Sequence, residues 1–171
     1  MAEIPCTVGL DIVDRIYDAY SNEEKAEKSQ IYLGRLGSSY IGNECIREVW
    51  FDWRAFEREE FHGRTLRLFG TGHLQEDRVV ADLRRAGFSV WEKRGDGKQY
   101  ECVDETGHFI TKLDGIITGL PRRKGAHVLE IKTHNKSNFN AVQKHGVAKS
   151  KPTHYAQVQI TMKLQNINQC L

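Results

Sequence analysis

The residues with the clearest capacity for chemistry are Asp114, Glu130 and Lys132. Glu130 and Lys132 flank Ile131 in the apolar stretch HVLEIKT, and Asp114 lies in HFITKLDGII. Side chains alternate between the two faces of a strand, so the glutamate and the lysine are predicted to share one face. Two carboxylates on a half-buried surface repel one another unless a divalent cation lies between them, and hard oxygen ligands suit Mg²⁺ or Mn²⁺. The lysine could then orient a water molecule and offset the charge that develops on a phosphate.

The [DE]xK pattern is not specific by itself, because the chain contains it three times. Glu23/Lys25 lies in a charged helical run and Asp96/Lys98 in a glycine-rich turn, so both are interpreted as solvated surface. The match in HVLEIKT alone lies in an apolar strand that follows an aspartate in a neighbouring predicted strand. That context favours a metal site over a surface Glu–Lys pair beside an unrelated loop aspartate.

Charge is distributed unevenly along the chain. Residues 112–171 contain ten Lys/Arg and two acidic residues, which gives a formal charge of +8. Residues 1–111 contain fifteen Lys/Arg and twenty-one acidic residues, which gives a formal charge of −6. A strongly basic segment is suited to a polyanion such as DNA. The two acids within it are Asp114 and Glu130, which supports a specific role for both. The candidate backbone-binding residues, each of which could also be merely solubilising, are Arg122, Arg123, Lys124, Lys136, Lys144, Lys149 and Lys151.

A predicted helix over about 65–86, ended by Gly87, offers a third ligand. His73 and Glu76 are three residues apart and therefore share a helical face. A lone helical histidine is more often hydrogen-bonded or solvated than a metal ligand, so both residues stay open as ligands. The apolar stripe predicted to continue this helix toward the core consists of Val79, Val80 and Leu83.

The elements that must position these residues follow from apolar spacing and turn signals. Further helices are predicted at about 8–28, at 41–54 after the N-cap serines Ser38 and Ser39, at 137–145 and at 153–165. Strands are predicted at 88–93, 98–105, 107–118 and 126–133. We expect the last two strands to pair through a turn at about 119–125, which would bring Asp114 near Glu130. The order predicts an α/β (α+β) fold with a central mixed β-sheet of four or more strands flanked by helices.

Length and composition fit one ordinary globular domain of 171 residues, 39% hydrophobic and 28% charged. No stretch is long and apolar enough for a membrane span, and the N-terminus lacks the pattern of a signal peptide. The four cysteines lie far apart without a CxxC pair, which favours reduced thiols and a cytoplasmic location.

The order GxxH…E on a helix, Asp on one strand and ExK on the next resembles the PD-(D/E)XK nuclease superfamily, in particular its RecB-like branch. The later segment THYAQVQITMKL looks like the glutamine motif of the YqaJ (lambda-exonuclease-type) phage recombination nucleases. The resemblance covers about 70–164. It implies a single nuclease domain over residues 1–171. Within this domain, a helical part at about 1–62 would precede a restriction-endonuclease-like core at about 63–171.

The resemblance also implies roles for the central residues. Asp114 and Glu130 would bind the metal together with the carbonyl oxygen of Ile131, and Lys132 would position the attacking water. Mg²⁺ or Mn²⁺ is the implied cofactor.

The flanking motifs leave alternatives open. His73 matches the histidine ligand of the RecB-like branch, whereas Glu76 matches the helical acid of the lambda-exonuclease type. Gln157 would hold or orient the active-site lysine or the DNA end, with Tyr155 nearby. RecB-like proteins commonly have a tyrosine four residues after the glutamine, but this chain has Thr161, so the branch is not settled.

The segment SSYIGNECIREVWFDWR resembles the one that carries the first cysteine in iron–sulfur nucleases. Those proteins add three cysteines after the glutamine motif, and here only Cys170 follows it. An Fe–S cluster is therefore not expected, and Cys45 is predicted to be a core residue. Nucleases of this kind usually continue beyond the glutamine helix, so a C-terminally truncated core is one alternative.

The function implied is a Mg²⁺-dependent DNA exonuclease of phage recombination or replication, acting in the cytoplasm of a bacterium or phage-infected host. The alternatives are a structure-specific DNA endonuclease or resolvase on the same core, and a non-catalytic DNA-binding recombination scaffold. DNA is the expected partner, with a single-strand annealing protein as a further candidate and an oligomer as an open alternative.

Overall fold

The computed structural model describes residues 8–28, 34–54 and 60–171. These residues belong to two compact units, one within 1–33 and 58–74 and the other within 34–57 and 75–171. Within the described ranges, no helix combines the length and apolar character that a bilayer crossing requires.

The first unit contains α1 (Val8–Lys28) and the beginning of α3 (Gly63–Arg85), so the predicted first helix is confirmed. The two helices approach closely at Gly63, where a Cβ atom would overlap the main chain of Tyr17. The ring of Tyr17 also contacts that of His62 edge to face, with centroids 5.6 Å apart. Glycine is therefore required at this contact because it has no side chain.

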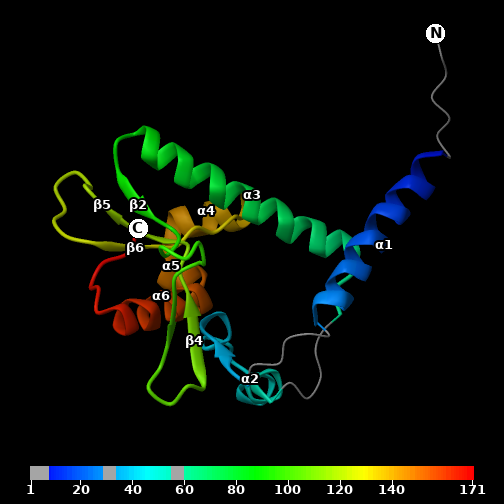
Figure 1. Ribbon diagram of the computed structural model, residues 1–171, viewed down its shortest axis with the longest axis horizontal. Coiled ribbons are helices and arrows are strands. Elements are labelled where there is room, and N and C mark those ends of the chain that lie inside the picture. Colours follow the sequence, from blue (N-terminus) through cyan, green and yellow to red (C-terminus); the bar gives the residue numbers. More distant parts are fainter. Residues whose placement is uncertain (1–7, 29–33, 55–59) are drawn as a thin grey trace, which may run out of the picture. The chain divides into compact units, whose positions relative to one another are not determined.

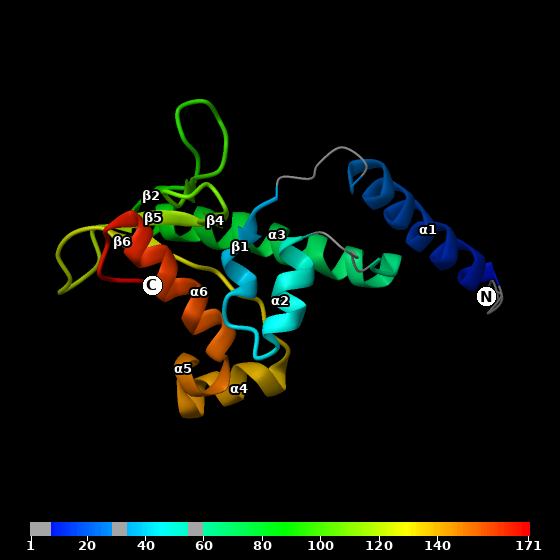
Figure 2. The same ribbon diagram turned by 90° about the horizontal axis from the view of Figure 1, so that it is seen from below.

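The second unit contains two small sheets of three strands each, seen in Figures 1 and 2. In spatial order the first sheet consists of β1 (Leu36–Gly37), β4 (Phe109–Lys112) and β3 (Glu101–Val103). The second sheet consists of β2 (Ser89–Trp91), β5 (Gly115–Thr118) and β6 (His127–Leu129). β1 runs parallel to β4, and the pairs β3–β4, β2–β5 and β5–β6 are antiparallel.

The fold is mixed α and β, as predicted, but the expected sheet of four or more strands is replaced by two sheets of three. The segment predicted as one strand at 107–118 is divided into β4 and β5, which enter different sheets. The break falls at Leu113 and Asp114. Leu113 is fully buried, and its N–H donates to the carbonyl of Tyr100. The restriction-endonuclease-like core stays a prediction.

The helices of this unit agree with the sequence in part. α4 (Lys136–His145) and α6 (Pro152–Gln165) are confirmed, whereas the short α5 (Val147–Ser150) between them was not predicted. The side chain of Asn135 caps α4 by accepting from the backbone N–H of Asn138. Figure 2 shows α4, α5 and the first turns of α6 lying together.

The helix predicted at 41–54 is shorter, because α2 spans Ile46–Trp53. Ser38 and Ser39 do not cap it; they lie in the 3-10 helix η1 (Ser38–Tyr40), where Ser38 is buried. Cys45 precedes α2 and is exposed, so its predicted core position is wrong.

The apolar core of the second unit lies between α3 and the second sheet. Its buried members are Val80, Val90, Ile117 and Leu129, with Leu83 and Ile131 among the residues packed against them. Val79 is 36% exposed and does not belong to the predicted stripe. α3 ends as expected near Gly87, whose φ of 90° suits glycine and whose N–H donates to the carbonyl of Arg84.

A second close approach joins the loop before α2 to α6. A Cβ atom on Gly42 would lie 2.5 Å from the Cα atom of Thr153 and 3.1 Å from the Cβ atom of Ala156. The loop can therefore pack on α6 only because residue 42 has no side chain.

Candidate functional site

The β5–β6 hairpin brings the two predicted metal-binding carboxylates to the same end of the second sheet. Gly115 pairs with Leu129, so Asp114, just before β5, lies beside Glu130, just after β6. A carboxylate oxygen of Asp114 accepts a 2.6 Å hydrogen bond from the backbone N–H of Ile131. The predicted pairing of the segments is confirmed, but both acids lie at strand ends rather than within strands.

Glu130 is the most constrained of these side chains, with 5% of its side-chain surface exposed. Its Oε1 atom accepts from Nε2 of Gln157 at 2.7 Å and lies 2.6 Å from Nζ of Lys132. Its Oε2 atom is buried and has no hydrogen-bond partner. Among the described residues, the two ring nitrogens of the fully buried His127 are also buried without a hydrogen-bond partner. Buried acceptors are rarely left unpaired in folded proteins, so this oxygen is available to a ligand.

The electrostatics of Glu130 reflect three acids in one region. Burial raises the pKa of its carboxyl group, the nearby Lys132 ammonium opposes that shift, and the charges of Asp114 and Glu76 raise the pKa further. Glu76, on α3, therefore adds to the negative charge around Glu130.

His73, the other candidate for the helical ligand, is exposed on α3. Glu76, three residues further along the same helix, is partly exposed. A helical third ligand, His73 or Glu76, stays a prediction.

Gln157 connects this cluster to a buried chain of hydroxyl groups that the sequence analysis did not identify. The backbone carbonyl of Gln157 accepts from Oγ1 of Thr161 at 2.9 Å, and that oxygen lies 2.7 Å from Oγ1 of Thr111. Thr111 in turn donates to Oγ of Ser38 at 2.9 Å. The one sequence signal was the position of Thr161, where the resembling nucleases commonly have tyrosine.

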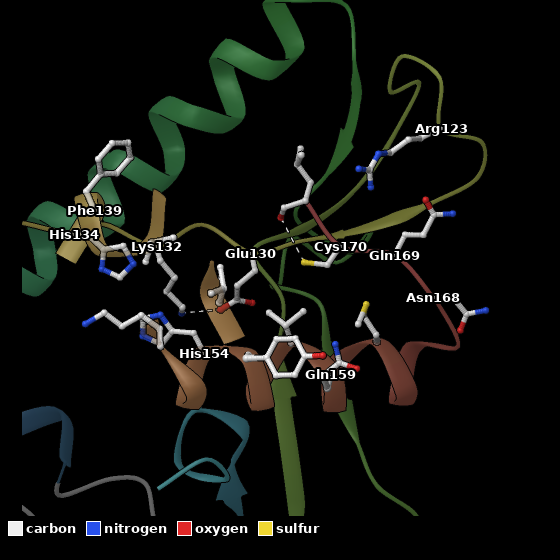
Figure 3. Close-up of a pocket in the computed structure, with 17 residues that line it drawn as sticks. Arg123, Glu130, Lys132, His134, Phe139, His154, Gln159, Asn168, Gln169 and Cys170 are labelled. Atoms are coloured by element: carbon white, nitrogen blue, oxygen red, sulfur yellow. Dashed lines mark hydrogen bonds and ion pairs between the residues drawn. The ribbon is translucent and has the colours of Figure 1, made fainter. Parts of the chain in front are cut away.

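An open cavity of about 630 Å³ lies beside Glu130 within the second unit, as Figure 3 shows. Of the predicted DNA-binding residues, Arg123, Lys151 and Tyr155 line it together with Lys132. Lys132 reaches Glu130 above helix α6, from which His154 projects. The remaining predicted cations do not line this cavity and are exposed; they are Arg122, Lys124, Lys136, Lys144 and Lys149.

Two histidines that the sequence analysis missed also line the cavity. The rings of His134 and His154 are stacked, with centroids 5.5 Å apart and planes inclined by 15°. Burial lowers the pKa of His154, and the nearby Lys132, His134 and Lys151 lower it further. These effects all favour the neutral form of the His154 ring. The two residues are 20 positions apart in different elements, and no sequence pattern links them.

Cys170 lines the same cavity and bridges to β6 through a parallel pairing with Val128. Burial, and then the charges of Glu130 and Asp114, raises the pKa of its thiol to about 11. The thiol is therefore protonated at neutral pH, and a thiol in that form is a poor nucleophile and metal ligand.

The donor atoms of the cluster suit a hard divalent cation. The carboxylates of Asp114 and Glu130 and the carbonyl of Ile131 are oxygen ligands of the kind that Mg²⁺ and Mn²⁺ prefer. The unpaired Oε2 of Glu130 fits such a ligand. Across the part of the chain that the structure describes, no group of three or more His, Cys, Asp or Glu side chains is preassembled around a metal position. Waters and substrate oxygens commonly complete the coordination of Mg²⁺.

Comparisons with known proteins do not add to this description. No protein-family model, curated protein or solved structure matches the chain. The case for its function therefore depends on the residues described above.

Proposed function

We propose that this chain is a metal-dependent deoxyribonuclease, in the first instance a DNA exonuclease of phage recombination or replication. The observation that carries the proposal is the environment of Glu130. This buried carboxylate is fixed through one oxygen by Lys132 and Gln157, while its other oxygen is unpaired and Asp114 lies beside it.

The cation would be held by Asp114, Glu130 and the carbonyl of Ile131, with His73 or Glu76 as the helical third ligand. Mg²⁺ or Mn²⁺ bound there would polarise the scissile phosphate and lower the pKa of the attacking water. The same positive charge would relieve the repulsion that raises the pKa of Glu130.

Lys132 and Gln157 have separate tasks in this proposal. Both contact Oε1 of Glu130, so Gln157 can keep the carboxylate oriented when Lys132 turns toward the attacking water or the phosphate. A lysine ammonium at that position offsets the negative charge that develops on the phosphate. Arg123 and Lys151 extend the positive charge along the cavity and would hold the DNA backbone without reading its sequence.

Lys132→Ala tests the catalytic role, and the chain provides a matched control. Asp96 and Lys98 form the same [DE]xK pattern in a turn. The carboxylate of Asp96 accepts hydrogen bonds there from the side chain of Arg94 and from the backbone N–H of Lys98. We expect Lys132→Ala to abolish Mg²⁺-dependent degradation of linear DNA, and Lys98→Ala to leave it intact. Unchanged degradation by Lys132→Ala would refute the catalytic assignment.

The substrate form separates the proposal from its alternatives. An exonuclease should degrade a linear duplex in Mg²⁺ and leave a covalently closed circle intact, whereas cutting of the circle would favour an endonuclease or resolvase. Salt-sensitive DNA binding without cleavage in any divalent metal would favour a non-catalytic recombination scaffold. A single-strand annealing protein is the further partner consistent with the exonuclease.

A further inference from the structure

The cavity beside Glu130 has two chemically different walls. Glu130, Lys132 and Arg123 form its charged wall, and helices α4, α5 and α6 supply its apolar wall. The apolar wall consists of Phe139, Val142, Val147, Tyr155, Val158 and Met162. A ligand that fills this space must therefore combine an anionic part with an apolar part.

Two aromatic rings dominate the apolar wall. Phe139 on α4 is 59% exposed, and Tyr155 on α6 is 45% exposed. Single exposed aromatic residues are common on protein surfaces. Here two of them, from different helices, line one cavity whose other wall carries the lysine of the candidate site. Aromatic side chains next to basic residues are the usual means by which proteins stack the bases of single-stranded nucleic acid.

The size and charge of the cavity agree with one nucleotide. Its volume of about 630 Å³ is typical of small-ligand sites, which span roughly 300–1,000 Å³. Three cations line the cavity, namely Arg123, Lys132 and Lys151, and an anionic group can therefore be held in it. A base inside a duplex is covered on both faces by its neighbours, so only an unpaired base can present a face to Phe139 or Tyr155.

We infer that this cavity is a subsite for one unpaired nucleotide of a DNA strand, with its base against Phe139 and Tyr155 and its phosphate at Lys132. The inference rests on the proposed function for the reaction and adds the substrate class to it. Single-stranded DNA is accepted, and a linear duplex is accepted only through ends that fray, so paired bases away from an end do not enter the subsite.

Binding without metal tests the subsite apart from cleavage. We use the full chain in EDTA and a single-stranded oligonucleotide that carries the fluorescent base 2-aminopurine, whose emission falls when it stacks on an aromatic ring. Binding should quench the emission, Phe139→Ala should weaken binding about tenfold, and Phe139→Trp should restore it. The matched control is Phe69→Ala, because Phe69 is 45% exposed on α3 and does not line the cavity. That variant should bind as the unmodified chain does.

The outcomes for the subsite and for the nuclease are separable. Quenching in EDTA without cleavage in Mg²⁺ would support the subsite and refute the proposed function. If the unmodified chain cleaves DNA and Phe139→Ala binds as well as the unmodified chain does, the subsite is refuted and the proposed nuclease function is retained. Equal quenching by 2-aminopurine placed inside a duplex with covalently closed ends would also refute the requirement for an unpaired base.

Discussion

Two polar clusters lie on either side of Gln157, and they differ in how completely their buried atoms are paired. The hydroxyl cluster consists of Ser38, Thr111 and Thr161, and the carboxylate cluster consists of Asp114, Glu130 and Lys132. The carbonyl of Gln157 accepts from Thr161 in the first, and its amide donates to Glu130 in the second.

In the hydroxyl cluster every side-chain oxygen lies within hydrogen-bonding distance of a partner. Thr111 and Thr161 are fully buried, and each contacts two oxygens of the cluster or of Gln157. These bonds tie α6 to β4 and η1, so the cluster stabilises the arrangement of the elements. The carboxylate cluster instead keeps a buried oxygen of Glu130 without a partner. The first cluster therefore connects elements of the fold, whereas the unpaired oxygen in the second is the atom to which the proposed metal would bind.

Glu130→Gln tests the carboxylate cluster most severely. We expect more than about a 10³-fold loss of cleavage rate, because metal catalysis contributes several kcal/mol and each 1.36 kcal/mol changes a rate tenfold. Differential scanning fluorimetry supplies an independent measurement: Mg²⁺ should raise the melting temperature of the unmodified chain and leave that of the variant unchanged. An equal rise in both would contradict the assignment of Glu130 as a metal ligand.

Gln157→Met examines the connection between the clusters. The variant keeps a long side chain but cannot donate to Glu130, so the carboxylate loses one of the two groups that orient it. We expect a loss of about 10–100-fold in metal affinity or cleavage rate, which is typical for groups that orient metal ligands. Isothermal titration with Mn²⁺ would measure the affinity. If the metal affinity and the cleavage rate of the variant are unaltered, Gln157 has no role in the site.

Thr161→Val examines the hydroxyl cluster. The substitution retains the shape of the side chain but leaves Thr111 with one partner fewer, so we expect a loss of about 1–3 kcal/mol in the free energy of unfolding. Urea denaturation measures the loss, and the Thr111→Val/Thr161→Val double variant should lose less than the sum of the single effects. Cleavage per folded molecule should not change. A loss of cleavage similar to that of Gln157→Met would contradict the separation of the clusters.

The smallest expected effect is a pH dependence of stability. Burial raises the folded-state pKa of Glu130 above its ordinary value of 4.5, so the folded chain binds this proton more tightly than the unfolded chain. The contribution of Glu130 to stability is therefore greatest below pH 4.5 and falls as the pH rises through the folded-state pKa. In EDTA, the stability of Glu130→Gln relative to the unmodified chain should increase with pH. A difference that is constant with pH would contradict the raised pKa.

The core of the site could be predicted because its signals are local. The apolar alternation around Asp114 and Glu130, with a turn between them, specifies a β-hairpin, and a hairpin places its two outer ends together. The break at Leu113 and Asp114 could not be predicted, because the apolar pattern continues across it. It depends on the hydrogen bonds that these residues make to Tyr100 and Ile131, which are distant in sequence.

The hydroxyl cluster was beyond sequence analysis for a similar reason. Thr111 is separated by 73 residues from Ser38 and by 50 from Thr161, and threonine and serine also occur widely on surfaces. Ser38 has the residue type of a helix cap, and only its burial shows that its hydroxyl is used elsewhere. The sequence could not choose between His73 and Glu76 as a third ligand, because the two residues are equivalent in spacing.

The close approach at Gly42 has a consequence for the genetics of this protein. Any side chain at position 42 would force the first turn of α6 to move, because its Cβ atom would meet the main chain of Thr153. Gln157 lies one turn further along that helix, so the hydrogen bond from Gln157 to Glu130 would be displaced together with the helix. A screen of random variants for lost activity should therefore recover position 42 alongside the acidic residues, although Gly42 itself takes no part in any reaction.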